Sequence, residues 1–139
     1  METLRKPIPR PSPESLPFWE AAKAHRLLLP RCNACGRFWF PPSKRCRHCL
    51  SPDFAWTESK GRGRIYSFVV YHRPYHPAFE GDVPYVVAVV ELDEGPRLLT
   101  NIVGTPPEAV RCDAHVRVVF EERDGAIIPM FSAIDPPEQ

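Results

Sequence analysis

The sequence predicts a mainly β protein in which a short helix and a small metal-stapled ribbon precede a five-stranded barrel. Two observations carry this prediction. Four cysteines are paired as CNAC and CRHC between Cys32 and Cys49. Beyond Gly61, five runs rich in β-branched and aromatic residues alternate with turn-forming residues. Five such runs favour a small closed or nearly closed barrel, because a β-sandwich usually has more strands.

The composition is that of a soluble globular chain. Of the 139 residues, 43% are apolar and 25% are charged, and the net charge is +1. No apolar run approaches the roughly 20 residues of a membrane helix, and the first residues do not resemble a secretory signal. We therefore expect a cytoplasmic protein that does not enter a membrane. Five cysteines, an odd number, favour reduced thiols and a bound metal over disulfides.

The charges are unevenly distributed along the chain. Seven Lys or Arg and no acidic residue lie between Ala21 and Pro52, whereas seven acids and three arginines lie between Glu108 and the C-terminus. The front half is therefore expected to present a basic surface that attracts an anion. This pattern alone fits a polyanion and a small phosphorylated ligand equally well.

The N-terminal residues divide into a proline-rich arm and a helix. Prolines are so frequent in residues 1–16 that we expect an extended or disordered arm, because proline fixes φ and removes backbone donors. Ser15 is a suitable N-cap for a helix predicted at about Pro17–His25. Phe18 and Trp19 are adjacent and cannot face the same way. One is expected in the core, and the other is expected to be available to a ligand or partner.

The spacing of the cysteines predicts a structural zinc site. Cys32 and Cys35 form one CxxC pair, Cys46 and Cys49 form the second, and ten residues separate the pairs. Each pair folds into a knuckle that brings two thiolates to one ion at roughly 2.3 Å. Four thiolates fill the coordination sphere of zinc, so no position remains for water or substrate; iron also suits four thiolates. We expect the ion to staple residues 17–60, a unit with little core of its own.

Two further residues near this chemistry are predicted to stay outside the metal site. His48 lies between the two cysteines of one knuckle and is expected on the surface. Cys112 is far from the other cysteines, and no His or acid lies at a spacing that would activate it. It is therefore interpreted as a free, small apolar side chain.

Residues 61–139 are predicted to form the barrel. The five β-rich runs are residues 63–71, 85–94, 97–104, 115–122 and 127–134. Glu94-Gly95-Pro96 separates the second run from the third and predicts a hairpin. Thr105, with Glu108 three positions later, forms a capping box that predicts one short helical turn after the third run.

No complete catalytic set is visible in the sequence. The loop-like stretch YHRPYHPAFEGDVPY holds His72, His76 and Glu80, residue types that serve in acid–base catalysis. Prolines interrupt the stretch, so the two histidines have no fixed common face, and contact with a ligand or partner is favoured over catalysis. No GxSxG elbow, GxxxxGK[ST] phosphate loop or GxGxxG fingerprint is present. An enzyme that acts alone is thus an alternative rather than the favoured interpretation.

These motifs, in this order, resemble an acyl-CoA-associated family that joins a rubredoxin-like zinc ribbon to an OB-fold and was catalogued as a domain of unknown function. The matching stretches are PFWEA, the first CxxC leading into FWFPP, CRHC followed by SPDFAW, GRGRIYSFVVYHRP, PYVVAVVELDEGPRLLTNIVG and PEAVRCDAHVRVVFEER. The resemblance covers about Leu16 to Phe131. The chain departs from it at Cys112-Asp113-Ala114, where members commonly have a glycine in the turn, so the turn type is open there.

The resemblance implies a non-catalytic subunit. Members of the family look like partners of thiolase-superfamily enzymes (thiolases, acyltransferases and retro-aldolases of CoA thioesters) or of hotdog-type enoyl-CoA hydratases. In such a hetero-oligomer the partner supplies the catalytic residues, and the acyl-CoA is a shared ligand. Basic and aromatic side chains suit the phosphates and the adenine or pantetheine of that ligand. The candidate contacts to CoA or partner are Phe18, Trp19, Arg31, Arg37, Phe38, Trp39, Lys44, Arg45, Arg47, His72 and Arg73.

Several interpretations remain open at this point. OB barrels often bind single-stranded nucleic acid with aromatic residues and a basic groove, and YSFVVYHR interleaves the two kinds of residue. The barrel nevertheless carries more acids than bases, which makes nucleic acid the less favoured ligand. A structural adaptor that docks a partner without touching CoA is a further possibility. The acyl group, whether fatty, aromatic or steroid, is not specified by any motif.

Overall fold

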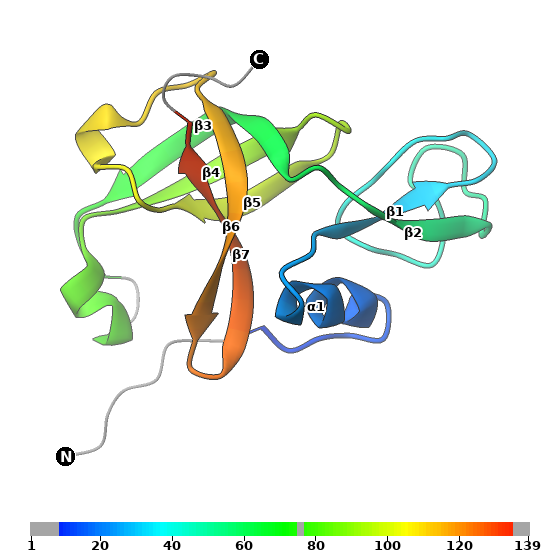
Figure 1. Ribbon diagram of the computed structural model, residues 1–139, viewed down its shortest axis with the longest axis horizontal. Coiled ribbons are helices and arrows are strands. Elements are labelled where there is room, and N and C mark those ends of the chain that lie inside the picture. The colour runs from blue at the N-terminus through cyan, green and yellow to red at the C-terminus, as the bar shows by residue number, and fades with distance from the viewer. Residues whose placement is uncertain (1–8, 75–76, 135–139) are drawn as a thin grey trace.

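A two-stranded ribbon and a five-stranded barrel lie next to each other, and helix α1 packs beneath the junction between them (Figure 1). The structure, a computed structural model, describes residues 9–74 and 77–134. In that part of the chain no helix has the length and apolar character needed to cross a bilayer. His76, one of the two histidines noted in the loop-like stretch, lies outside the described residues.

Helix α1 spans Leu16–Lys23, so it ends two residues earlier than the predicted helix, and His25 beyond it has a positive φ of 58°. Ser15 is the N-cap residue, but its side chain does not cap the helix. Because Ser15 has a helical backbone conformation, its hydroxyl turns back instead and accepts the N–H of Ser12 at 2.9 Å. The predicted cap is therefore right in position and wrong in mechanism, and the arm before it contains a turn.

The two aromatic residues of α1 divide as predicted. The side chain of Phe18 is buried in the main core, with 5% of its surface exposed. Trp19 is partly buried and packs edge-on against Phe18, with 4.9 Å between the ring centroids. The helix contacts β7 and β1, so its apolar face joins the ribbon to the barrel.

The ribbon is built on two short antiparallel strands. Strand β1 (Leu28–Cys32) pairs with β2 (Phe54–Glu58), and the chain between them carries both cysteine knuckles. Trp39 forms a small core with the buried metal-site cysteines, and Phe54 packs edge-on against its ring at 5.1 Å. This core is small, and other apolar residues of the ribbon, including Leu29 of β1 and Trp56 of β2, pack into the main core instead. That residues 17–60 depend on a metal staple stays a prediction.

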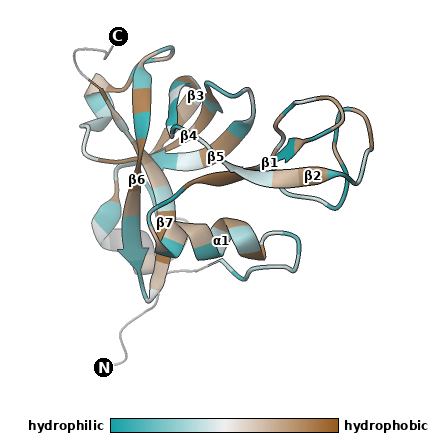
Figure 2. Ribbon diagram, turned by 45° about the vertical axis from the view of Figure 1, so that its right-hand side comes forward, coloured by the Kyte–Doolittle hydropathy of each residue, from teal (hydrophilic) through white to brown (hydrophobic). Residues whose placement is uncertain are grey.

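The barrel has five strands in the closed order β3-β4-β5-β7-β6, as predicted. Its strands are β3 (Arg62–Tyr71), β4 (Tyr85–Leu92), β5 (Arg97–Ile102), β6 (His115–Arg123) and β7 (Ala126–Ala133). Strands β5 and β7 run parallel and meet only at Ile102 and Phe131, whereas every other neighbouring pair is antiparallel. Figure 2 shows hydrophobic and hydrophilic residues alternating along the strands. On β4 every second side chain is buried, the period expected of a strand with one face on the core.

The turns predicted from the sequence form, with one change. Gly95 has a φ of +116°, and its N–H donates to the carbonyl of Leu92 at 2.8 Å, which closes the β4–β5 hairpin. A 3₁₀ turn (η2, Pro107–Ala109) follows β5, but Thr105 does not cap it. The two prolines at the start of the turn have no N–H to offer, and the Thr105 hydroxyl instead accepts the N–H of Ala133 at 3.4 Å. A second 3₁₀ turn, η1 (Pro77–Asp82), lies in the β3–β4 connection.

The β4–β5 hairpin also holds the link between ribbon and barrel. One carboxylate oxygen of Glu94 accepts the hydroxyl of Ser59 at 2.8 Å, and the other accepts the N–H of Lys60 at 2.9 Å. The Ser59 hydroxyl accepts the N–H of Gly61 at 3.0 Å, and the Ser59 N–H donates to the carbonyl of Leu27 at 2.8 Å. Ser59 is only 6% exposed, so these bonds form in a dry environment where they fix the orientation of the ribbon.

Candidate metal centre and ribbon–barrel cleft

The four predicted cysteines converge on one point. Their sulfur atoms all lie within 4.8 Å of one another. The sulfurs of Cys32 and Cys49 are 3.4 Å apart, and those of Cys35 and Cys46 are 3.6 Å apart. A tetrahedral zinc with bonds of roughly 2.3 Å places its sulfur ligands about 3.8 Å apart, so this donor set fits a four-thiolate structural zinc. The sulfur-only ligand set leaves no open position for chemistry.

Backbone N–H groups around the knuckles stabilise the negative charge of the thiolates even without a metal ion. The N–H of Cys35 points at the sulfur of Cys32 at 3.4 Å, and this contact contributes most to lowering the pKa of Cys32 to about 6. At Cys46, burial acts in the opposite direction, but N–H groups, including that of His48 at 3.3 Å, still lower the pKa. The backbone N–H of Ser51 favours the Cys49 thiolate, yet the neighbouring sulfurs raise the pKa of Cys49 to about 12. A divalent cation at the centre relieves this accumulation of negative charge.

The two residues predicted to lie outside the site do so. His48 is exposed, and its Nε2 lies 3.2 Å from the carbonyl oxygen of Phe38, which ties the second knuckle to the loop after the first. Cys112 is a free thiol away from the cluster. It is exposed rather than packed, so its interpretation as a small apolar side chain is corrected: it sits at the tip of the turn before β6.

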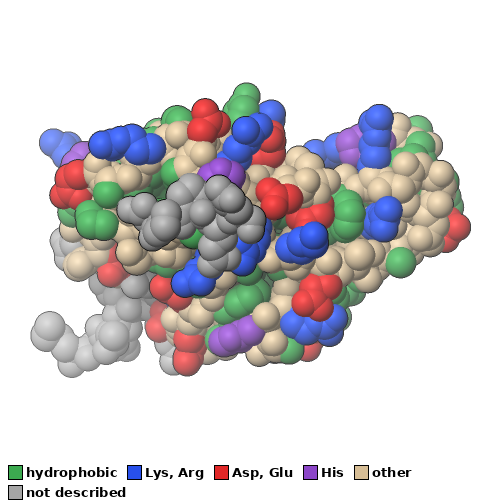
Figure 3. Space-filling model, turned by 45° about the horizontal axis from the view of Figure 1, so that its top comes forward, with side chains coloured by type: hydrophobic (Ala, Val, Ile, Leu, Met, Phe, Trp, Pro, Cys, Tyr) green, Lys and Arg blue, Asp and Glu red, His purple; other side chains and the backbone are tan. Residues whose placement is uncertain are grey.

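A cleft of about 610 Å³ lies between the ribbon and the β4–β5 hairpin. The residues that line it are Gly36, Arg37, Phe38, Trp39, Phe40, Arg47 and His48 from the ribbon, and Glu91, Glu94, Gly95, Pro96 and Arg97 from the hairpin. The guanidinium groups of Arg37 and Arg47 have no carboxylate partner among the described residues, whereas Arg97 is paired with Glu91 at 3.1 Å. Figure 3 shows Lys, Arg and His side chains at the ribbon end and acidic side chains interspersed over the barrel. The ribbon wall of the cleft is thus its cationic wall.

Comparison with known proteins agrees with this architecture. The model of the rubredoxin-like zinc ribbon domain of ChsH2 matches residues 19–55, and that of the C-terminal OB-fold domain of ChsH2 matches residues 56–121. A "DUF35 domain-containing scaffold protein" of Methanocaldococcus jannaschii is 34% identical over 116 residues, which are 79% of this chain and 82% of that protein. The chain belongs to the ChsH2 (DUF35) family.

A solved structure of a family member shares the whole fold. It is titled "Ltp2-ChsH2(DUF35) aldolase", is 42% identical, and superposes with a TM-score of 0.82 over 91% of this chain and 98% of that one. A probable enoyl-CoA hydratase alpha subunit of Thermomonospora curvata is 45% identical over 124 residues, or 88% of this chain. The chain spans only 38% of the length of that relative. A benzoylsuccinyl-CoA thiolase subunit, BbsA of Thauera aromatica, is 30% identical over 110 residues, 73% of this chain and 69% of BbsA.

Within this family fold, the predicted contact residues fall into separate groups. Arg37, Phe38 and Arg47 line the cleft together. Trp39 is 2% exposed and donates its indole N–H to Ser43 at 3.0 Å, so it belongs to the ribbon core and not to an exposed surface. Phe18 is likewise buried, in the main core, and Trp39 nevertheless lines the cleft. Contact of either residue with CoA or a partner stays a prediction.

Other predicted cations lie outside the cleft. The guanidinium of Arg31 covers the ring of Phe38 at 5.5 Å and donates to the carbonyl of Gly36 at 3.1 Å, so it supports the cleft wall from behind. Lys44 lies 3.9 Å from Glu14, and Arg45 donates to the carbonyl of Leu50 at 3.2 Å. Lys44 and Arg45 line a separate hollow beside the N-terminal arm.

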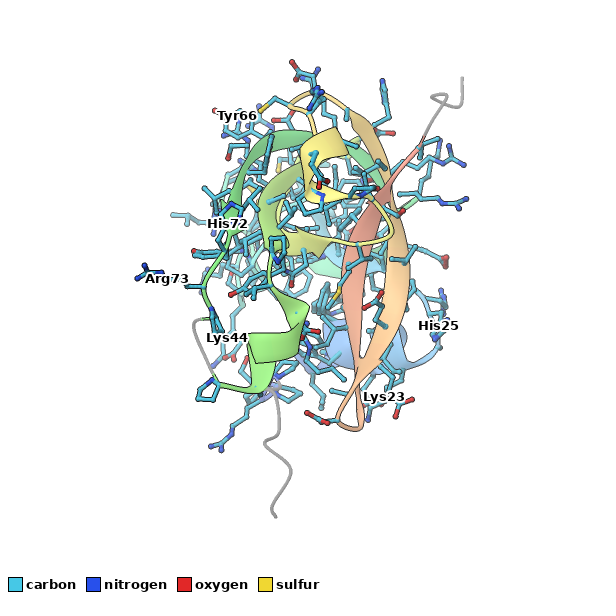
Figure 4. The ribbon with its side chains drawn as sticks, turned by 90° about the vertical axis from the view of Figure 1, so that its left-hand side faces the viewer. Lys23, His25, Lys44, Tyr66, His72 and Arg73 are labelled. Carbon is cyan, nitrogen blue, oxygen red and sulfur yellow. The ribbon has the colours of Figure 1, made fainter. Side chains whose placement is uncertain are left out.

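His72 and Arg73 lie at the end of β3 that points away from the ribbon, as Figures 1 and 4 show. Both side chains are exposed in a shallow hollow beside Tyr71, and the cleft is at the opposite end of the barrel. The fold therefore does not combine these residues with the ribbon cations in one site.

Glu91 and Arg97 are cleft residues that the sequence did not single out. Arg97 and Arg64 both donate to the Glu91 carboxylate, at 3.1 and 3.3 Å. The stretch ELDEGPR contains both charges, but only the hairpin register, which places Glu91 directly opposite Arg97, brings them together. A helical wheel or a spacing rule would not have found this pair, because the contact crosses two strands.

The Glu91 ion pairs predict a small acid-dependent loss of stability. The hydrogen bond from Arg97, followed by that from Arg64, lowers the pKa of Glu91 below its usual value of 4.5. A carboxylate with a lowered folded-state pKa stabilises the fold above about pH 4.5, and this stabilisation disappears as the pH falls through the folded value. We expect Glu91→Gln to lower the free energy of unfolding only slightly at neutral pH, because these pairs are partly exposed. Urea unfolding of both proteins at neutral and strongly acidic pH measures the difference, and a cost that grows toward acid contradicts the assignment.

Proposed function

We propose that the chain is a non-catalytic accessory subunit of a thiolase-like enzyme that acts on acyl-CoA, and that the ribbon–barrel cleft contacts the CoA thioester. The observation that carries this proposal is the cationic wall of the cleft, where two guanidinium groups that have no carboxylate partner among the described residues line the cleft together with a half-buried aromatic ring. The residues that line the cleft include no serine, threonine or cysteine nucleophile. A site that binds without reacting is what an accessory subunit needs.

The chemistry of CoA matches this wall. Arginine guanidinium groups bind phosphate through paired N–H donors, so Arg37 and Arg47 suit the phosphates of the nucleotide. The ring of Phe38 lines the same cleft, where an adenine ring or pantetheine arm can pack against it. Zinc holds the loops that carry all three side chains, which gives the metal a structural role in ligand binding.

The relatives support a multi-subunit setting. The solved relative is titled as an aldolase of Ltp2 with ChsH2, and BbsA is described as a subunit of a thiolase. By analogy, the partner of this chain is a thiolase-superfamily enzyme that supplies the catalytic residues, in a cytoplasmic hetero-oligomer. The alternative partner is a hydratase, because another relative is described as a hydratase alpha subunit.

Affinity capture from the native cell extract tests the proposed assembly. We expect a thiolase-superfamily or hydratase protein to be recovered at near-equal stoichiometry and identified by mass. Recovery of nucleic acid alone, or turnover of an acyl-CoA by the purified chain without a partner, would remove the accessory-subunit proposal.

Charge reversal in the cleft tests CoA contact. The double substitution Arg37→Glu and Arg47→Glu is expected to weaken binding of acetyl-CoA by the complex at least tenfold, about 1.4 kcal/mol, because two phosphate contacts become repulsive. Titration calorimetry at two salt concentrations measures the loss and its screening. Lys44→Glu with Arg45→Glu is the matched control, since both residues are exposed ribbon cations outside the cleft. Equal losses in the two double variants would show that ribbon charge in general, and not the cleft, binds the ligand.

A further inference from the structure

The outer face of the β3–β4–β5 sheet carries apolar side chains where a solvated sheet carries polar ones. Val69 is 53% exposed and Leu99 is 76% exposed, and both point away from the barrel core. Between them, Val87 and Val89 of β4 are half-buried and outward-facing, so β4 is apolar on both of its faces. Antiparallel strands with one face in water normally alternate apolar and polar residues. A strand that is apolar on both faces indicates a sheet that is covered on both sides.

The strand register makes these residues one contiguous patch, here called the outer apolar patch (Val69, Val87, Val89 and Leu99). Val69 lies directly opposite Val87, and Val89 lies directly opposite Leu99. Side chains in such opposed positions are neighbours about 5 Å apart on the same face. The four apolar residues come from three adjacent strands and form one surface. The same two rows also hold Asn101, opposite Val87, and Ser67, opposite Val89, so the patch is polar at these two corners.

The border of the outer apolar patch has the composition of a protein–protein interface. At the ribbon end, the Arg97 guanidinium lies 3.8 Å from the ring centroid of Tyr66, which is itself 52% exposed. At the far end, Tyr71 packs against Tyr85 with 5.2 Å between centroids, and His72 follows. Figure 4 shows Tyr66, His72 and Arg73 along the same margin of the molecule, opposite His25 and Lys23 of the α1 side. An apolar centre with Tyr and Arg around it is typical of protein interfaces.

Charge argues against two other occupants of this surface. From Gly63 to the C-terminus the sequence has twelve Asp or Glu and six Lys or Arg. At the patch itself, Arg64 and Arg97 share the single carboxylate of Glu91. Nucleic acids and anionic membranes both require an extended, unpaired cationic surface, and both arginines here are already ion-paired, so this side of the barrel is poorly suited to either.

One residue joins the outer apolar patch to the cleft. Arg97 lines the cleft and also stacks on Tyr66 at the edge of the patch. A protein seated on the patch therefore reaches the mouth of the cleft, next to any ligand held there. Helix α1 packs on β7 and β1. Its Trp19 lines a hollow of about 270 Å³ together with Leu99 and Pro129, so α1 borders the patch at its β5 edge but leaves Leu99 76% exposed.

We propose that the outer apolar patch is the docking surface for the catalytic subunit, which closes the open side of the cleft along Arg97. This inference rests on the proposed function and names the surface through which it operates. Burial of the patch by the partner places the thioester, emerging from the cleft, within reach of the partner's catalytic groups. Because His72 and Arg73 lie along the margin of the patch, the proposal assigns them to contact with the partner and not with CoA.

Glutamate substitutions on the patch test the docking surface. Leu99→Glu and Val69→Glu each place a charge within the patch, one on β5 and one on β3, without entering the barrel core, so the fold is expected to survive, with an unchanged far-UV circular dichroism spectrum. Affinity for the purified enzyme identified by the capture experiment is expected to fall at least thirtyfold, about 2 kcal/mol, because the charge would be buried without a partner. Biolayer interferometry measures this. Leu50→Glu, on the ribbon and 68% exposed, is the matched control and is expected to bind like the wild type.

The outcomes separate the two proposals. If the wild-type chain captures no thiolase-superfamily or hydratase enzyme, the proposed function fails and the docking surface with it. If the wild type binds such an enzyme and both glutamate variants bind it equally well, only the docking surface is wrong. If the wild type is a dimer that Leu99→Glu dissociates while enzyme binding is retained, the patch is covered by a second copy of this chain, and the proposal is overturned.

Discussion

Replacement of Cys46 by serine is expected to unfold the ribbon while the barrel stays folded. Cys46 is completely buried in the small core that Trp39 shares with the metal site. Zinc binding to comparable structural sites provides roughly 10–16 kcal/mol, far more than one buried tryptophan can replace. Loss of one thiolate breaks the four-sulfur set, so the loops between β1 and β2 lose the interaction that holds them.

Zinc content and limited proteolysis together measure this effect. We expect the wild type to carry one zinc per chain and the Cys46→Ser variant almost none, and we expect trypsin to cut the variant rapidly after Arg37 and Arg47. The barrel should resist, because most of its core comes from β3–β7 and α1, although Leu29 of β1 also belongs to that core. Cys112→Ser is the control, since Cys112 is an exposed free thiol outside the cluster. A Cys46→Ser protein that keeps its zinc and its trypsin resistance would show that the ribbon does not depend on the four-cysteine site.

The metal centre and the barrel were predictable because their signals are local. CxxC spacing specifies knuckle geometry within four residues, and the period-2 pattern of runs such as YVVAVVEL specifies a strand and its buried face. Asp113 shows the limit of such rules: it has a φ of 65°, the left-handed conformation for which members commonly use glycine. Aspartate tolerates that conformation better than most residues, so the turn keeps its shape without glycine.

The cleft was only half predictable, because its two walls come from distant parts of the sequence. The basic run in the ribbon indicated an anion-binding surface, but the opposite wall is a hairpin whose charges were not singled out. The burial of Trp39 was not predicted, although a signal for it existed. Phe38, Trp39 and Phe40 alternate partly exposed, buried and partly exposed, as expected of extended chain, and the middle residue faces inward. Lys44 and Arg45 line a separate hollow outside the cleft, which a count of charges along the sequence does not reveal.

Replacement of Gly63 by alanine is expected to destabilise the barrel severely. Gly63 pairs with Leu92 of β4 on one side and with Val116 of β6 on the other, at the point where β3 bends to close the barrel. A Cβ added there would lie 2.2 Å from the carbonyl oxygen of Glu91 and 2.9 Å from its carbonyl carbon. These are backbone atoms, so no side-chain rotation relieves the clash, and the β6 pairing prevents β3 from moving away. We expect a loss of about 3 kcal/mol or more, at the upper end of overpacking effects, measured by urea unfolding.

Gly81→Ala separates this clash from the general cost of replacing glycine. An added Cβ at Gly81 meets no atom within 4 Å, so the substitution is expected to change stability by no more than about 0.5 kcal/mol. If Gly63→Ala proved equally harmless, β3 and β4 could separate without loss of stability, and the close approach at Glu91 would have no structural role.

The same test bears on function, because Glu91 stands in the wall of the cleft and in the border of the outer apolar patch. If Gly63→Ala shifts Glu91 as expected, folded material that remains should also bind the catalytic subunit and CoA more weakly. A single change at Gly63 would then weaken the closure of the barrel and, through Glu91, both proposed binding surfaces.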